Sequence, residues 1–160
     1  MALFRKAIEH LAKIYNINTK SIILDGFGKG GYGVLQLALQ YPGKFRGVIV
    51  RSGILAPPEH SGAERIMDML DRAKNLSVLI VHGDQERAFP VDEVRRIVSR
   101  LREMKANIAY IEVKGAQSTR AERWEDVFSW LRDTWGDSVV NLSPPKRPRD
   151  RETEKRAEKG

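Results

Sequence analysis

The chain contains no cysteine and no long apolar run. Without cysteine, disulfide bonds, thiolate nucleophiles and cysteine-ligated metal sites are excluded. The uninterrupted apolar stretches are far shorter than the roughly 20 residues that a membrane-spanning helix needs. The first residues lead into an amphipathic helical pattern and do not resemble a signal peptide. These absences predict a cytoplasmic protein with no membrane contact and no metal site, and nothing in the sequence calls for a cofactor.

The size and composition fit one ordinary globular domain. A chain of 160 residues suffices for a real core, since a domain of about 150 residues buries roughly 70% of its unfolded surface. Its hydrophobic content of 41% and charged content of 31% are typical of globular proteins. We expect the folded domain to occupy residues 1–137.

The remaining residues, 138–160, are predicted to form a disordered, charged C-terminal tail. Residues 143–160 hold seven Lys or Arg, four Asp or Glu and three prolines, and almost no apolar side chains. Such a segment cannot bury enough surface to offset the entropy lost on ordering. The net charge of +7 and the basic stretch 146–149 raise the possibility of nucleic-acid binding, but a solvated tail is the simpler interpretation and a nucleic-acid partner is not favoured.

Helical and strand patterns alternate along the rest of the chain. Helices are expected at residues 2–15, 34–39, 63–74, 91–104 and 124–135, and strands at 21–24, 47–50, 77–81 and 109–113. Short apolar strands separated by helices indicate a parallel sheet with right-handed crossovers. The sequence therefore predicts an α/β fold, a three-layer α/β/α arrangement around a short, mostly parallel sheet of about four strands. Ligands of such sheets bind beyond the carboxyl ends of the strands.

A glycine-rich turn, residues 25–33 (DGFGKGGYG), connects the first expected strand to the next helix. A sharp strand-to-helix turn through glycines is the setting of the G-x-S-x-G nucleophile elbow. Here the matching register is residues 26–30, and Gly28 stands where that motif has its serine. The turn therefore indicates the architecture of the elbow without its nucleophile.

Three further segments extend this likeness. Residues 41–48 (YPGKFRGV) resemble the entry to the strand after the elbow, residues 82–90 (HGDQERAFP) resemble the H-G-x-x-D-x-x-V-P segment, and residues 113–118 (VKGAQS) resemble P-G-x-x-H. In order and spacing, residues 1 to about 135 resemble the α/β-hydrolase superfamily, in particular carboxylesterases, dienelactone hydrolases and prolyl-oligopeptidase-like enzymes. The resemblance implies the C-terminal half of that fold, a partial α/β-hydrolase fold.

The resemblance also assigns the positions of the catalytic triad. It places Gly28 at the nucleophile, Glu86 at the acid and Gln117 or Ser118 at the histidine. A triad needs a nucleophile, a base that takes its proton and an acid that orients the base, and only the acid remains. The resemblance implies that the backbone N–H of Lys29 is the one donor of the oxyanion hole that this chain retains. It therefore implies a protein without an intact catalytic site.

Other residues are candidates for lining a ligand cleft. Phe27 adjoins the elbow, and Ser52 ends the second strand. His60 lies in the loop that follows, although a lone loop histidine is usually solvated. His82 follows the third strand, where the resemblance favours a structural role.

Three interpretations of function are therefore open. The leading one is a non-catalytic binding or structural module, or the remnant of a larger hydrolase. A second is an atypical carboxylic-ester hydrolase that uses Ser52, Ser118 or a residue outside this segment. A third is a Rossmann-like dinucleotide-binding protein, since Gly26, Gly28 and Gly31 match G-x-G-x-x-G and Arg51 suits a 2′-phosphate.

The last expectation concerns the edge of the sheet. The resemblance implies strands before the elbow strand, whereas this chain starts at the helix that leads to it. Ser21, Ile22, Ile23 and Leu24 would then form an unprotected edge without charge, proline or bulge. We expect this edge to pair, in a homodimer or with a partner chain.

Overall fold

A parallel four-stranded sheet forms the centre of the protein. The computed structural model describes residues 2–15, 17–53, 66–117 and 124–136. The strands are β1 (Ile23–Phe27), β2 (Gly47–Arg51), β3 (Ser77–Gly83) and β4 (Asn107–Val113). They lie in the order β1-β2-β3-β4, and each neighbouring pair is parallel.

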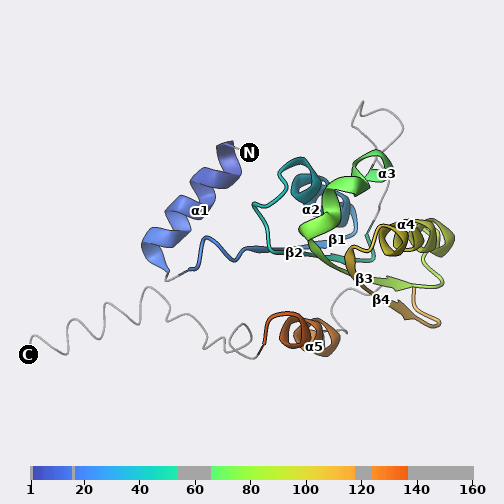
Figure 1. The fold of residues 1–160 in the computed structure, drawn as a ribbon. Coiled ribbons are helices and arrows are strands. Elements are labelled where there is room, and N and C mark those ends of the chain that lie inside the picture. Colours follow the sequence, from blue (N-terminus) through green and yellow to red (C-terminus); the bar gives the residue numbers. More distant parts are fainter. Residues whose placement is uncertain (1, 16, 54–65, 118–123, 137–160) are drawn as a thin grey trace, which may run out of the picture.

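Helices cover both faces of the sheet. The described helices are α1 (Ala2–Ile14), α2 (Lys29–Gln40), α3 (Ile66–Met69), the 3-10 helix η1 (Leu70–Asn75), α4 (Val91–Glu103) and α5 (Trp124–Trp135). Figure 1 shows α2, α3 and α4 on one face of the sheet and α5 on the opposite face. This is the predicted three-layer α/β fold, and the prediction of about four strands is confirmed.

The two central strands explain why the sheet is stable. Every residue of β3 is buried, and so are the first four of β2. Val48, Val50 and Ile80 belong to the apolar cluster beneath α2 and α4. Ile49 and Leu79 belong to a second cluster, beneath α5. Strands covered on both faces are expected to be almost continuously apolar, as these are.

The junction of β1 and α2 differs from the sequence prediction. β1 starts at Ile23 and continues through Asp25 and Gly26 to Phe27, in register with β2, although residue 25 was expected to open the turn. α2 starts at Lys29 and not at residue 34. Both differences have one cause: the change from strand to helix is completed at a single residue, Gly28, so no loop is needed.

β3 and β4 are each two residues longer than predicted, since β3 ends at Gly83 and β4 starts at Asn107. The third and last helices differ as well. The helix expected at residues 63–74 is described only from Ile66, and it tightens into the 3-10 helix η1 at Leu70. In α5, the large apolar side chains are not all buried. Val127 and Trp130 are buried, but Trp124 and Phe128 are exposed.

Several predicted features fall outside the described residues. They are His60, Ser118 and the tail, residues 138–160. Within the described parts of the chain, no helix is both long and apolar enough to cross a bilayer.

Candidate functional site

Gly28 has the backbone conformation of a nucleophile elbow. It lies between the last residue of β1 and the first of α2, with φ of +56° and ψ of −123°. Its N–H donates to the carbonyl of Arg51 at 3.1 Å, and its own carbonyl accepts from Gly31 N–H at 3.0 Å. A Cβ built at Gly28 would meet no heavy atom of the described residues within 4 Å. The position is therefore open and strained for other residues, and it carries no side chain.

The neighbouring glycines serve close packing. A Cβ at Gly26 would lie 2.4 Å from the carbonyl oxygen of Gly30, and one at Gly31 would lie 2.8 Å from Cα of Gly53. These contacts let α2 start directly against the end of β1 and beside the end of β2. The G-x-G-x-x-G pattern is thus explained by the geometry of the turn, without a nucleotide.

Backbone hydrogen bonds join the other loops at the carboxyl end of the sheet. Ser52 N–H donates to Val81 O at 2.8 Å, which links the end of β2 to β3. The loop after β3 is tied to the loop after β4, since Gln85 N–H donates to Ala116 O at 3.1 Å and Asp84 Oδ1 accepts from Gly115 N–H at 2.7 Å. The segments that the sequence assigned to the acid and to the histidine therefore lie side by side.

Glu86, at the acid position, is bonded within its own loop. Its side chain is buried, and Oε1 accepts from Gly83 N–H at 3.1 Å. The same oxygen lies 3.8 Å from Nδ1 of His82. This carboxylate therefore stabilises the turn after β3. Gln117, at one of the two possible histidine positions, is exposed and offers an amide, which is no base near neutral pH.

His82 lies in the core and does not line an open cleft. Its side chain is fully buried, and Nε2 lies 2.9 Å from the carbonyl of Phe89. Because a carbonyl only accepts, Nε2 must carry the proton in this contact. Among the described residues, Nδ1 has no hydrogen-bond partner. The imidazole thus ties the loop that precedes α4 to the end of β3.

The two remaining cleft candidates differ in exposure. Phe27, the last residue of β1, is 36% exposed. Ser52 is only 6% exposed, and its φ of +44° is one of two positive values among the described non-glycine residues. A serine held in this conformation is strained by about 1–3 kcal/mol. Because such strain is concentrated at functional sites, Ser52 remains a candidate residue at the carboxyl end of the sheet.

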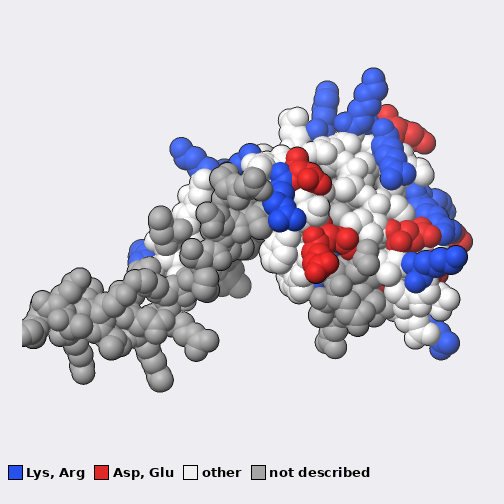
Figure 2. Space-filling model, turned by 90° about the horizontal axis from the view of Figure 1, so that it is seen from below, with Lys and Arg blue, Asp and Glu red and all other residues white. Residues whose placement is uncertain are grey.

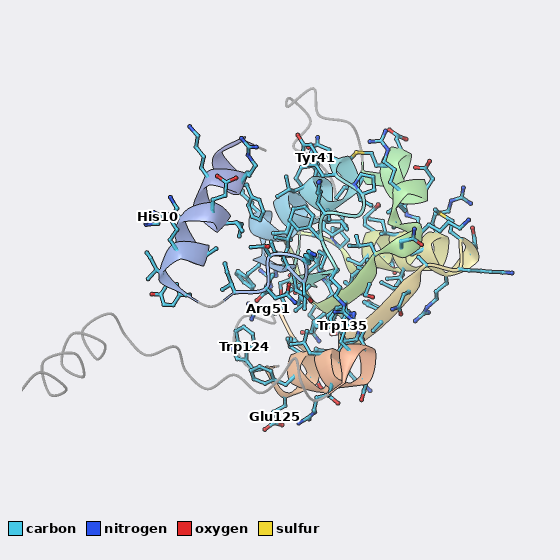
Figure 3. The ribbon with its side chains drawn as sticks, turned by 60° about the vertical axis from the view of Figure 1, so that its left-hand side comes forward. His10, Tyr41, Arg51, Trp124, Glu125 and Trp135 are labelled. Carbon is cyan, nitrogen blue, oxygen red and sulfur yellow. The ribbon has the colours of Figure 1, made fainter. Side chains whose placement is uncertain are left out.

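Beside the elbow, Arg51 contacts two side chains, and the sequence did not predict either contact. The Arg51 guanidinium donates from Nε and Nη2 to the two carboxylate oxygens of Asp25, at 2.9 and 2.7 Å. Its Cζ also lies 4.3 Å from the ring centroid of Trp124, and Figure 3 shows Arg51 and Trp124 at the α5 side of the sheet. Arg51 is therefore already engaged, which weakens the dinucleotide interpretation. A tryptophan at the start of a helix gives no sequence signal for such a contact.

A second ion-pair cluster lies at the opposite edge of the sheet. Arg95 of α4 donates to both carboxylate oxygens of Glu112 on β4, at 3.0 and 2.6 Å, and Tyr110 donates to Glu112 Oε2 at 2.8 Å. The hydrogen bond from Arg95 is the main cause that lowers the pKa of Glu112, and that from Tyr110 adds to it. Burial, and then the bond to Glu112, raise the pKa of Tyr110.

Charges of both signs are mixed over the described surface. On α4, Arg96 pairs with Glu93, and Arg100 pairs with Glu103 at 3.2 Å. Figure 2 shows Lys and Arg interspersed with Asp and Glu on the face seen from below. Among the residues that the structure describes, no three His, Asp or Glu side chains gather in a way that could hold a metal ion.

The comparison with known proteins agrees with this architecture. The parallel sheet and the elbow define a partial α/β-hydrolase fold. The phospholipase/carboxylesterase family matches residues 1–134, and the chain belongs to this family.

Solved structures support the fold alone, because their sequences are distant. An S-formylglutathione hydrolase from Staphylococcus aureus matches with a TM-score of 0.64 and 16% identity, over 80% of this chain and 58% of its own. A thermostable esterase matches with a TM-score of 0.63 and 21% identity, over 82% of this chain and 36% of its own. A carboxylesterase from Bacillus cereus matches with a TM-score of 0.58 and 17% identity, over 78% and 55%.

The chain thus spans between about a third and somewhat more than half of the length of these three solved structures. No curated protein is similar enough in sequence to be recognised as a relative.

Proposed function

We propose that this chain is a non-catalytic member of the phospholipase/carboxylesterase family, acting as a binding or structural module. The observation that carries the proposal is Gly28, which has the backbone conformation of the elbow, with φ of +56°, and no side chain. Acyl transfer through a covalent intermediate needs a nucleophile at this point.

The two other triad positions support the same proposal. The Glu86 carboxylate accepts a hydrogen bond from Gly83 N–H in its own loop. Its role is therefore to hold this loop, and not to orient a catalytic histidine. The histidine position is either Gln117, which supplies an amide, or Ser118, which supplies a hydroxyl, and neither group is a base near neutral pH. Even with a hydroxyl restored at position 28, neither side chain could accept its proton in the way that the triad requires.

The conformation of Gly28 itself fits a site released from catalysis. A non-glycine residue with positive φ costs about 1–3 kcal/mol, and enzymes accept this strain for function. Glycine adopts the same conformation with little strain. The close packing of α2 against Gly26 and Gly53 holds the geometry of the elbow. Because residue 28 is a glycine, its positive φ causes little backbone strain.

A fluorophosphonate probe tests the proposal, with intact-mass spectrometry as the readout. We expect no adduct on the full chain. The variant Gly28→Ser should react weakly or not at all and should not become an efficient esterase, because the base is missing.

A cysteine variant provides the control for access. The chain has no cysteine, so Gly28→Cys would carry a single thiol, at an open position. Rapid reaction of this thiol with a maleimide would show that reagents reach the elbow. A wild-type chain that forms a fluorophosphonate adduct at one serine would contradict the proposal.

The strained serine favours one competing function, ester hydrolysis through Ser52. Its φ of +44° is of the kind that clusters at active sites, although the residue is almost buried. If Ser52 is a nucleophile, the adduct will map to it and Ser52→Ala will abolish labelling. The control Ser129→Ala, at an exposed position on α5, should leave any labelling unchanged.

A further inference from the structure

A cavity of about 220 Å³ opens at the amino end of the sheet, between the carboxyl ends of α2 and η1. These two helices are in contact, and they lead into β2 and β3, the two central strands. The elbow lies at the other end of α2, at Gly28. The cavity is therefore separate from the elbow, and its walls come from internal segments of the chain, residues 38–43 and 72–76.

One side of the cavity is apolar and firmly held. Ala38 of α2 and Leu76, the residue after η1, are buried in the main core cluster. The turn after α2 is closed by a hydrogen bond from Lys44 N–H to the carbonyl of Tyr41, at 3.2 Å. We call this side the apolar wall, and its members are Ala38, Pro42, Gly43 and Leu76.

The opposite side of the cavity is basic. It consists of Arg72, Lys74 and Asn75 of η1, and all three side chains are exposed to solvent. Among the described residues, no acidic side chain lines the cavity. Asp71 precedes Arg72, but successive residues of a 3-10 helix point a third of a turn apart. Two positive charges and one amide therefore face the cavity without a carboxylate.

Both cations can bind an anion there. Within the described parts of the chain, the Lys74 ammonium has no ion pair and no hydrogen bond. Arg72 does interact elsewhere in the protein, but a guanidinium has five N–H donors. By contrast, Arg51 and Arg95, at the other end of the sheet, each donate to both oxygens of a carboxylate.

The position of the two cations at a helix end has a second consequence. Basic side chains stabilise the carboxyl end of a helix through its dipole. Lys13 has the same position in the last turn of α1, and it does not line the cavity. The dipole thus accounts for the charge of Arg72 and Lys74 but not for the cavity beside them, and Lys13 provides a matched control.

We propose that this cavity binds a small phosphomonoester. The dianion matches the two positive charges, since arginine and lysine both bind phosphate, and the Asn75 amide can donate a further hydrogen bond. Pockets for drug-sized ligands hold about 300–1,000 Å³, so this smaller cavity suits a phosphate with a short carbon group against the apolar wall. The proposal goes beyond the proposed function and does not depend on whether the elbow is catalytic.

NMR titration of the ¹⁵N-labelled full chain with ethyl phosphate tests the proposal. We expect saturable shifts of the backbone amides of Gly43, Lys74 and Asn75, and none at residues 29–31, where α2 begins. A phosphomonoester loses its second proton at about pH 6, so ethyl phosphate should bind several-fold more weakly below that pH. Ethyl sulfate keeps one negative charge and should bind more weakly, with no such pH dependence.

Variants locate the binding site. Lys74→Met and Arg72→Gln should each weaken ethyl phosphate binding about tenfold or more, as expected for the loss of a charge-assisted hydrogen bond. Lys13→Met removes an equal charge at another helix end and should leave the affinity unchanged. All three side chains are exposed, so the variants should fold, and their amide spectra verify this.

Three results would overturn the proposal. The first is an equal loss of affinity in Lys13→Met, which would show that only the net charge matters. The second is an absence of saturable shifts at the cavity, or shifts at residues 29–31 in their place. The third is tighter binding of duplex DNA that falls steeply with added salt and is not displaced by ethyl phosphate, which would show a basic surface without a site.

Discussion

Replacing Gly28 by alanine should destabilise the protein, while the same change two residues later should stabilise it. Gly28 has a φ of +56°, whereas Gly30 lies in the first turn of α2 with ordinary helical geometry. A Cβ at either position would meet no heavy atom within 4 Å. The two substitutions thus add the same side chain into free space, at a half-buried position for Gly28 and an exposed one for Gly30, and the main difference between them is backbone conformation.

The magnitudes follow from this difference. At Gly28, the strain of about 1–3 kcal/mol for a non-glycine residue with positive φ exceeds the roughly 0.4–1 kcal/mol gained from a less flexible unfolded chain. We expect Gly28→Ala to lower the free energy of unfolding by about 0.5–2 kcal/mol. Gly30→Ala should raise it by about 0.5–1 kcal/mol, since alanine is the better helix former.

Urea unfolding followed by circular dichroism measures both changes, and the thermal midpoints should move by a few degrees in opposite directions. Equal stabilisation by the two substitutions would show that residue 28 does not hold the elbow conformation. The description of a relaxed elbow would then be refuted.

Three further predictions concern residues away from the elbow. Trp124→Ala should lower the free energy of unfolding by about 1 kcal/mol or less through loss of the contact with Arg51, and Trp124→Phe should retain part of it; urea unfolding measures both. The lowered pKa of Glu112 means that its contribution to stability is present above the unfolded-state pKa and is lost as pH falls through the folded-state pKa. Arg95→Gln should raise the Glu112 pKa, measured by carboxyl NMR, and shift acid unfolding to higher pH. Deletion of the chain from Ser143 onward should leave the thermal midpoint unchanged, because that segment has almost no apolar side chains.

The order of the elements could be predicted from the sequence because their signals are local. The short apolar runs of β2 and β3 are typical of strands buried on both faces, and the helices between them have clear apolar periodicity. The end of β1 could not be placed so well. Asp25 and Gly26 are poor strand formers, but their pairing with Ile49 and Val50 is a tertiary contact that outweighs local preference.

The position of the elbow could be predicted from the sequence, but the side-chain contacts around it could not. The glycine spacing of residues 26–33 identified Gly28, since few turns need that pattern. The contact of Arg51 with Asp25 and Trp124 joins residues distant in sequence, which no periodicity reveals. The bond from Gly83 N–H to Glu86 depends on the turn that follows β3, and the sequence alone allowed a free carboxylate there.

The most direct test of the account is the hydrolysis of a short acyl ester, such as p-nitrophenyl acetate, by the purified full chain. The account predicts a rate equal to that of buffer with an inert protein at the same concentration, for the wild type and for Ser52→Ala alike. Saturable turnover by the wild type that Ser52→Ala abolishes would contradict it and would make the chain an esterase with a displaced nucleophile.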